Sequence, residues 1–164
     1  MMTLISWRYL TADILRSVLH YDADSGLFTR LTGRYKGKIA GSVGGAGYIQ
    51  ITVCGIKENG HRLAWLYMTG EWPTHGLDHR NLIKTDNRWE NLRPATKQQN
   101  NYNRGLTVKN KSGYKGVSRC GNRWRAQCRV NGINYSIGYF LDPASASSAY
   151  QDFARMHHGE FFRA

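Results

Sequence analysis

A short part of the chain places acidic, imidazole and carboxamide side chains at wide, definite intervals. Asp78 and His79 are neighbours, and Asn91 and Asn100 follow further along the chain. An Asp-His pair can supply a metal ligand and a general base side by side, while the amide oxygen of Asn can complete a site for a hard cation or orient the base. One cation can neutralise the charge that develops on a phosphodiester and stabilise the leaving alkoxide. The pattern therefore indicates metal-assisted phosphodiester hydrolysis.

The charge balance indicates a polyanionic partner. The 164 residues include 23 Lys and Arg against 11 Asp and Glu, a formal net charge of +12. Neutralising phosphates releases condensed counterions and so gives affinity for nucleic acid. No apolar run approaches the roughly 20 residues of a membrane-spanning helix, and the N-terminus lacks the apolar core of a signal peptide. We expect double-stranded DNA as the partner, no membrane, a monomer without an obligate protein partner, and a cytoplasmic location.

The three cysteines favour a reducing compartment. Cys54, Cys120 and Cys128 form no CxxC pair, so neither a zinc knuckle nor a disulfide framework is indicated. We expect small buried or half-buried thiols.

Short elements must bring the reactive side chains together. Residues 76–79 and 91–96 predict two short segments around a polar loop, and Thr96 is a suitable N-cap for a helix over 97–103. Two strands and a helix can bring Asp78, His79 and Asn100 to one spot. Upstream, the pattern predicts a short helix over 11–21 with Thr11 as N-cap, a half-buried strand over 48–53, and a buried helix over 61–68 that ends near Gly70.

Several motifs in order resemble the HNH endonucleases of phages and mobile introns. They are His61-Arg-Leu-Ala-Trp, Gly70-Glu-Trp-Pro, Asp78-His79-x-Asn81, Asp86-Asn87-Arg88, Asn91-Leu92-Arg93-x-Ala95-Thr96 and Gln99-Asn100-x-x-Asn103. The resemblance covers roughly residues 20–103 and implies a ββα-metal site. It implies that His79 is the general base, that Asp78 and Asn100 hold one Mg²⁺ or Mn²⁺ ion, and that Asn91 fixes the loop and the orientation of the histidine.

Other polar residues near these motifs have simpler interpretations. Asp86, Asn87 and Arg88 are interpreted as turn builders and a phosphate contact, and His61 as a packed, hydrogen-bonded core histidine. The chain departs from the family at Leu82, where the family often has Gly. This departure matters for the geometry of the loop, because Leu resists a positive φ.

The C-terminal part has the clearest β pattern. Residues 123–130 alternate, with Trp124, Ala126, Cys128 and Val130 on one face and arginines on the other. Asn131-Gly132 is a strong hairpin signal, and we expect Ile133, Tyr135 and Ile137 to face inward on the returning strand. Asp142-Pro143 then begins a helix. A sheet with one free basic face suits the major groove of DNA.

This part resembles the AP2 DNA-binding domain. The motifs are Ser112-Gly-Tyr-Lys-Gly-Val, Trp124-Arg-Ala, Ile137-Gly-x-Phe140 and His158-Gly-Glu-Phe161. The resemblance implies DNA contacts from Lys115, Ser118, Arg119, Arg125, Gln127, Arg129, Asn134 and Ser136. A polar linker precedes it, whose Arg104, Lys109 and Lys111 could track a phosphate backbone or simply solvate a connector.

The sequence thus predicts an α+β protein with three parts. They are an HNH nuclease domain over 1–103 (ββα-metal core about 60–103, after a small antiparallel sheet), a basic linker over 104–112, and an AP2-like domain over 113–164 with a three-stranded antiparallel sheet on one helix. The expected activity is that of a metal-dependent, site-directed, homing-type DNA endonuclease that nicks. The alternative is a DNA-binding regulator with a catalytically inactive HNH fold; an RNA-binding protein ranks last, because the sheet lacks a paired aromatic platform.

Overall fold

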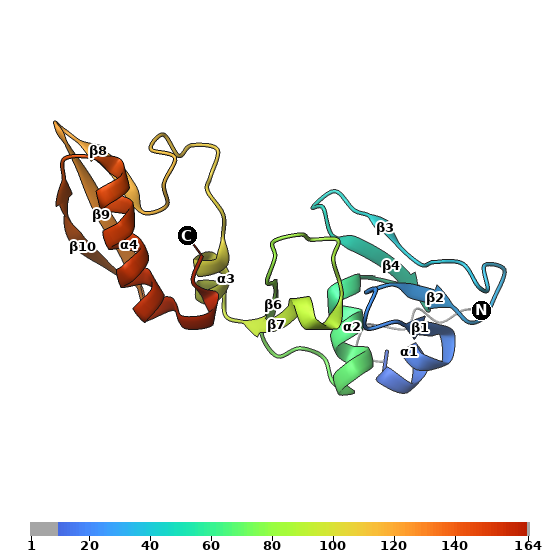
Figure 1. The fold of residues 1–164 in the computed structure, drawn as a ribbon. Coiled ribbons are helices and arrows are strands. Elements are labelled where there is room, and N and C mark those ends of the chain that lie inside the picture. Colours follow the sequence, from blue (N-terminus) through green and yellow to red (C-terminus); the bar gives the residue numbers. More distant parts are fainter. Residues whose placement is uncertain (1–9, 164) are drawn as a thin grey trace. The chain divides into compact units, whose positions relative to one another are not determined.

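A computed structural model describes residues 10–163, and its fold is drawn in Figure 1. The chain divides after Thr96 into two compact units, each described here by itself. The predicted nuclease domain extends to residue 103, whereas in the structure residues 97–103 group with the C-terminal unit. Residues 1–9 of that predicted domain lie outside the described residues. The domain boundaries stay a prediction.

Over residues 10–96, the first unit combines two helices with three small antiparallel sheets. Helix α1 (Ala12–Val18) begins after Thr11, whose side chain accepts a hydrogen bond from the backbone of Ile14, as predicted. Helix α2 (Gly60–Thr69) ends at Gly70, which has a φ of +85°. The first sheet pairs β1 (Leu19–Tyr21) with β2 (Phe28–Arg30), and in the second β4 (Ile49–Val53) lies between β3 (Ser42–Val43) and β5 (Ile56–Asn59). The third sheet pairs β6 (Gly76–His79) with β7 (Leu92–Ala95). The short 3₁₀ helix η2 (Trp89–Asn91) directly precedes β7.

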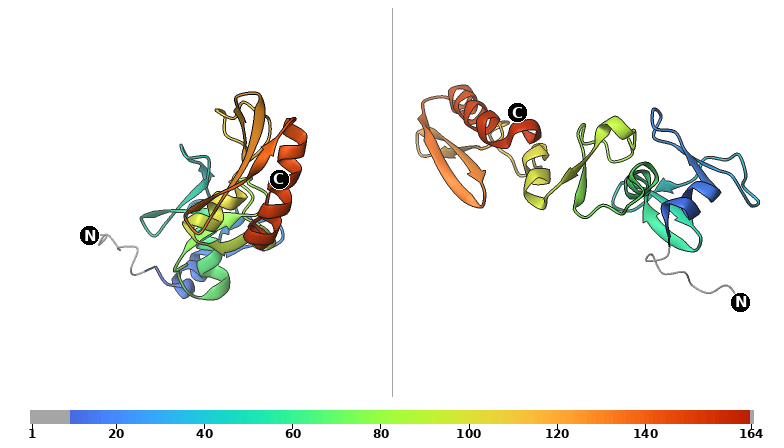
Figure 2. Two further views of the ribbon diagram at one scale, coloured as in Figure 1. Left: turned by 90° about the vertical axis from the view of Figure 1, so that its left-hand side faces the viewer. Right: turned by 90° about the horizontal axis from the view of Figure 1, so that it is seen from below.

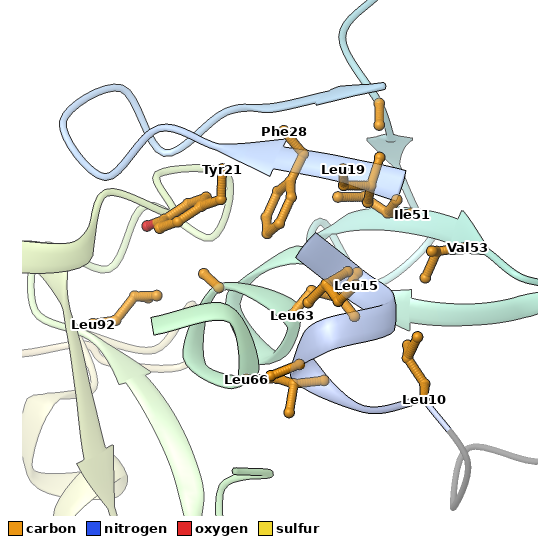
Figure 3. Packing of buried hydrophobic residues seen from close by; sticks show 13 residues of the cluster. Leu10, Leu15, Leu19, Tyr21, Phe28, Ile51, Val53, Leu63, Leu66 and Leu92 are labelled. Carbon is orange, nitrogen blue, oxygen red and sulfur yellow. The ribbon is translucent and has the colours of Figure 1, made fainter. Parts of the chain in front are cut away.

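One hydrophobic core holds the first unit together. Figure 3 shows Leu15 of α1, Phe28 of β2, Ile51 of β4 and Leu63 of α2 packed against one another. Each such side chain contributes roughly 1.5–3 kcal/mol by leaving water. Leu92 of β7 belongs to the same cluster. The hairpin of β6 and β7 is therefore anchored in the core through Leu92, next to the residues singled out for chemistry.

The second unit is a three-stranded antiparallel sheet with a helix on one face. Its elements are α3 (Lys97–Asn103), β8 (Val117–Cys120), β9 (Arg123–Val130), β10 (Ile133–Phe140), α4 (Pro143–His158) and the 3₁₀ helix η3 (Gly159–Phe161), with strand order β10-β9-β8. Figure 2 shows α4 running along the sheet. Asp142 caps α4 by accepting a hydrogen bond from Ser145 N, and the hairpin turn has φ angles of +50° at Asn131 and +82° at Gly132. The predicted sheet, turn and helix are confirmed.

A β-bulge in β10 changes which side chains face the helix. Ser136 pairs with Gln127 and Gly138 pairs with Ala126, so Ile137 is an extra residue between the two pairs. Strict alternation would turn Tyr139 inward; instead Tyr139 pairs with Arg125 and is 51% exposed. A Cβ on Gly138, next to the bulge, would lie 3.1 Å from the ring of Phe140.

Three side chains are exposed, although two of them lie on the predicted inward side of the sheet. Ile133 and Tyr135 are 58% and 41% exposed, although they pair with the inward-facing Val130 and Cys128. Tyr135 does contact the rings of Phe153 and His157 on α4, so its side of the sheet was predicted correctly. Cys120 is exposed rather than buried, and all three cysteines are free thiols. Over residues 10–163, no helix is long and apolar enough to cross a membrane.

Candidate active site and nucleic-acid interface

The β6–β7 hairpin places Asp78 and His79 side by side at the end of a short strand. Asp78 pairs across the hairpin with Arg93, and His79 pairs with Leu92. Both side chains are buried, at 3% and 5% exposure. Arg93 donates from Nε and Nη2 to the Oδ2 oxygen of Asp78, each over 2.9 Å. The guanidinium therefore fixes the orientation of the carboxylate and offsets the cost of burying its charge.

The imidazole of His79 lies against Asn87 and two aromatic neighbours. Its Nε2 is 3.3 Å from the Oδ1 oxygen of Asn87, and its ring centre lies 5.1 Å from that of His61 and 5.8 Å from that of Tyr48. Burial lowers the pKa of His79 below its ordinary value, while the contact with Asn87 and the charge of Asp78 act in the opposite direction. The lowered pKa favours a neutral imidazole at neutral pH, which can accept a proton.

Asn91 holds together the loop between the two strands. Its Nδ2 donates to Asn81 Oδ1 over 3.0 Å and to the backbone oxygen of Asp86 over 2.8 Å, and its Oδ1 accepts from the backbone of Asn81 over 3.0 Å. The expected loop-fixing contacts are thus present. The side-chain contact to the His79 ring comes from Asn87. Leu82 has a φ of +65°, so this loop uses a left-handed position without a glycine.

The three residues of the run Asp86-Asn87-Arg88 have two different roles. Arg88 donates to both carboxylate oxygens of Asp86, which lowers the pKa of Asp86 to about 2. Asn81 Nδ2 adds a bond of 2.7 Å to the same carboxylate. Asp86 and Arg88 therefore build the turn, as the sequence indicates. Asn87 is buried at 2% exposure and reaches the imidazole, a role that the sequence analysis missed; a carboxamide inside a charged turn is the only signal that could have indicated it.

His61 lies beside the candidate site. It is buried on α2 with its ring against those of Tyr48 and His79, and no described group forms a hydrogen bond with its Nδ1. Burial lowers the pKa of His61 to about 3, and the neighbouring His79 acts in the same direction. His61 is thus a packed core histidine as expected, but one with an unsatisfied ring nitrogen.

Asn100 is exposed on α3, in the second unit. Helix α3 is attached within that unit through Tyr102, whose ring stacks on His158 with centroids 3.7 Å apart, and whose hydroxyl accepts from the backbone of Asn131 over 3.2 Å. Asp78 and Asn100 therefore belong to different units.

The donor chemistry of Asp78 and Asn100 fits a hard divalent cation. Mg²⁺ commonly takes one or two carboxylates, keeps several waters, and leaves other positions to substrate oxygens. Among residues 10–163, no three His, Cys, Asp or Glu side chains are arranged to hold a metal ion. Asp78, held by Arg93, offers a carboxylate oxygen, and Asn100 offers a carboxamide oxygen.

The sheet of the second unit gathers six of the predicted DNA-binding residues on one face. Arg125 pairs with Ser118, Gln127 with Ser136, and Arg129 with Asn134 across the neighbouring strands. We call these six residues, together with Arg123 and Tyr139, the arginine face. Tyr139 joins it because of the bulge in β10, so sequence periodicity alone did not reveal it. Arg125 Nε is buried without a hydrogen-bond partner among the described residues.

The other predicted DNA contacts lie elsewhere. Arg119 pairs with Trp124 and its guanidinium lies over that ring, 5.4 Å from the centroid, which puts it on the opposite side from the arginine face. Lys115 Nζ donates to the backbone oxygens of Tyr102 and Arg163, and burial lowers its pKa to about 8. The linker side chains are exposed: Arg104, Lys109 and Lys111.

Comparison with known proteins agrees with part of the sequence analysis. Residues 60–102 match the model of a family described as HNH endonuclease. Over 103 residues, 62% of this chain and 54% of the relative, the sequence is 34% identical to an uncharacterized HNH endonuclease of Acanthamoeba polyphaga mimivirus. The chain therefore spans about half the length of that relative. No solved structure matches the chain. The predicted similarity to HNH endonucleases is confirmed over residues 60–102, while the similarities to AP2 domains and to phage enzymes stay predictions.

Proposed function

We propose that the protein is a metal-dependent, site-directed DNA endonuclease of the HNH type that nicks duplex DNA. One observation carries the proposal: a buried imidazole, His79, stands next to a buried carboxylate, Asp78, which Arg93 holds in place. The HNH match over residues 60–102 includes all three residues. A DNA substrate implies action in the cytoplasm or nucleoid of a host cell, and the resemblance to homing endonucleases implies a role in element mobility.

The residues would divide the reaction as follows. His79, neutral at neutral pH, accepts the proton of the attacking water. Asp78 and Asn100 hold one Mg²⁺ or Mn²⁺, which when bound would neutralise charge on the scissile phosphate and stabilise the leaving alkoxide. Asn91 keeps the loop in shape through its contacts with Asn81 and Asp86. The guanidinium of Arg93 already balances the charge of the Asp78 carboxylate. The charge of the bound cation would therefore be left to balance the anionic phosphate of the substrate. The products would carry a 5′-phosphate and a 3′-hydroxyl.

The arginine face would place the nuclease on DNA, in the manner of an AP2 domain. Arg125 and Arg129 lie two residues apart on the central strand and are flanked by the short polar side chains of Ser118, Asn134 and Ser136. Arginines can contact phosphates or guanine edges, while the short polar groups permit close approach to a groove. A monomer with one such site cuts one strand, so a nick is the expected product.

Supercoiled plasmid carrying fragments of phage and bacterial genomes tests the proposal. Wild type with Mg²⁺ or Mn²⁺ should convert supercoiled to relaxed circles, and EDTA should abolish the conversion. His79→Ala should lose cleavage but keep DNA affinity, whereas His75→Ala, an exposed histidine nearby, should cut like wild type. Sequencing the nicked ends then maps the target. Tight, site-specific binding without cleavage by wild type would instead support the alternative, a regulator with an inactive HNH fold.

A further inference from the structure

We propose that the β1–β2 hairpin acts, through Asn87, as a positioning element for His79 and fixes which ring nitrogen carries the proton. The inference rests on the proposed role of His79 as the base. It concerns Tyr21, Ala23 and Gly26, which lie outside the 60–102 region that matches the HNH family.

The first step is the contact between Asn87 and His79. Asn87 Oδ1 lies 3.3 Å from His79 Nε2, and both side chains are buried. A carboxamide oxygen only accepts hydrogen bonds, so this contact requires the proton on Nε2. In a neutral imidazole the lone pair is then on Nδ1. Asn87 therefore selects Nδ1 as the nitrogen that receives the proton of water.

The second step is how the backbone of Asn87 is held. The Tyr21 hydroxyl donates to the backbone oxygen of Asn87 over 2.6 Å, and the backbone N–H of Trp89 donates to Ala23 O over 2.9 Å. These two hydrogen bonds attach the backbone of residues 87–89 to the hairpin at both ends, at Asn87 and at Trp89. The ring of Tyr21 packs against the rings of Phe28 and Tyr67, with centroid distances of 4.8 Å and 5.7 Å. Burial raises the pKa of Tyr21, so its hydroxyl stays protonated and remains a donor.

The third step is the space around Asn87. A Cβ on Gly26 would lie 2.4 Å from Arg88 N and 2.5 Å from the carbonyl carbon of Asn87. A Cβ on Gly60 would lie 2.7 Å from Asn87 Nδ2. Two glycines thus let the hairpin and the start of α2 close on Asn87 from different elements. The carboxamide has little freedom to turn away from the imidazole.

The full chain can be tested by nitrogen-15 NMR of the His79 ring at about pH 8, where the imidazole is neutral. Wild type should show the Nε2–H tautomer without metal or DNA. Asn87→Ala should give a mixture with Nδ1–H and lower kcat for nicking by about 10–100-fold, by analogy with the partners that orient metal-ligating histidines. Asn87→Asp, which keeps an acceptor oxygen, should keep the wild-type tautomer.

The hairpin is tested by a matched pair of tyrosine variants. Tyr21→Phe removes only the hydroxyl that holds Asn87 and should lower kcat several-fold, with KM unchanged and partial loss of the tautomer preference. Tyr67→Phe makes the same chemical change in the same aromatic cluster and should leave both readouts at wild-type values.

Three results would overturn the inference: an Nδ1–H tautomer in wild type, a wild-type tautomer in Asn87→Ala, or equal effects of the two tyrosine variants. If Asn87→Ala does not fold, the wild-type tautomer and the tyrosine pair still decide. Because the NMR readout needs no cleavage, the two proposals can fail separately. A protein that never cuts DNA would sink the proposed nuclease function, whereas an Nε2–H tautomer in that protein would still support the hydrogen bond by which Asn87 orients His79.

Discussion

Asp78 and Arg93 are cross-strand partners, and two guanidinium nitrogens of Arg93 lie 2.9 Å from a single carboxylate oxygen of Asp78. Both side chains are almost completely buried. Neither charge could be left alone at this depth, because an unpaired buried ion carries a large desolvation penalty. The pair therefore joins β6 to β7 and holds the carboxylate that the proposed function assigns to the metal.

Breaking this pair from the arginine side should strongly destabilise the first unit. Arg93→Leu leaves Asp78 as a buried, uncompensated charge, and we expect a loss of about 3–5 kcal/mol in the free energy of unfolding. Arg88→Leu is the control, since Arg88 is substantially exposed in its pair with Asp86 and its loss should destabilise the protein much less. Urea unfolding of both variants measures the difference. Equal losses in the free energy of unfolding would contradict the role of Arg93 in compensating the buried charge of Asp78.

Acid should destabilise the protein through His61. Its pKa is about 3 in the folded state against 6.5 as the ordinary value, so the folded state binds fewer protons than the unfolded chain. Its contribution to stability is therefore present above pH 6.5 and is lost as the pH falls towards 3, by on the order of a few kcal/mol. His61→Phe keeps the ring but cannot titrate. Thermal unfolding across this pH window should show a flatter decline for the variant, and parallel curves would refute the assignment.

Removing arginines from the arginine face should weaken DNA binding and its dependence on salt. Arg125→Ala combined with Arg129→Ala deletes up to two phosphate contacts, which should lower the slope of log affinity against log salt by about 2. Arg155→Ala is the control, because Arg155 is an exposed arginine of α4 rather than of the sheet. Fluorescence anisotropy at several salt concentrations provides the slopes. An unchanged slope in the double variant would exclude this face as the DNA contact.

Two glycines of the second unit should differ sharply in their tolerance of alanine. A Cβ on Gly116 would lie 2.2 Å from the Tyr150 ring and 2.7 Å from Gln127 O, at a φ of +70°. A Cβ on Gly121 would meet nothing within 4 Å, at a φ of +58°. Gly121→Ala should therefore cost only the backbone strain of about 1–2 kcal/mol, and Gly116→Ala about 1–3 kcal/mol more from overpacking. Denaturant midpoints of the two variants compare them directly.

Local sequence signals predicted most elements well because each depends on neighbouring residues. Thr11, Gly70, Asn131-Gly132 and Asp142 mark helix ends and a turn through their own backbone and side-chain chemistry. The bulge at Ile137 escaped prediction, since one inserted residue reverses the side-chain pattern without changing composition. The exposure of Ile133 escaped for a different reason: pattern gives the face of a strand but not how far a helix covers it.

In the candidate site, the reactive residue types could be predicted from the sequence, because Asp78 and His79 are covalent neighbours and their chemistry is intrinsic. The tertiary structure alone decided which groups surround them: Arg93 on Asp78, and Asn87, His61 and Tyr48 around His79. It also decided that α3, which carries Asn100, groups with the C-terminal unit. These relationships depend on packing between segments that are far apart in the sequence. The free energy of such packing cannot be predicted from a short stretch of residues.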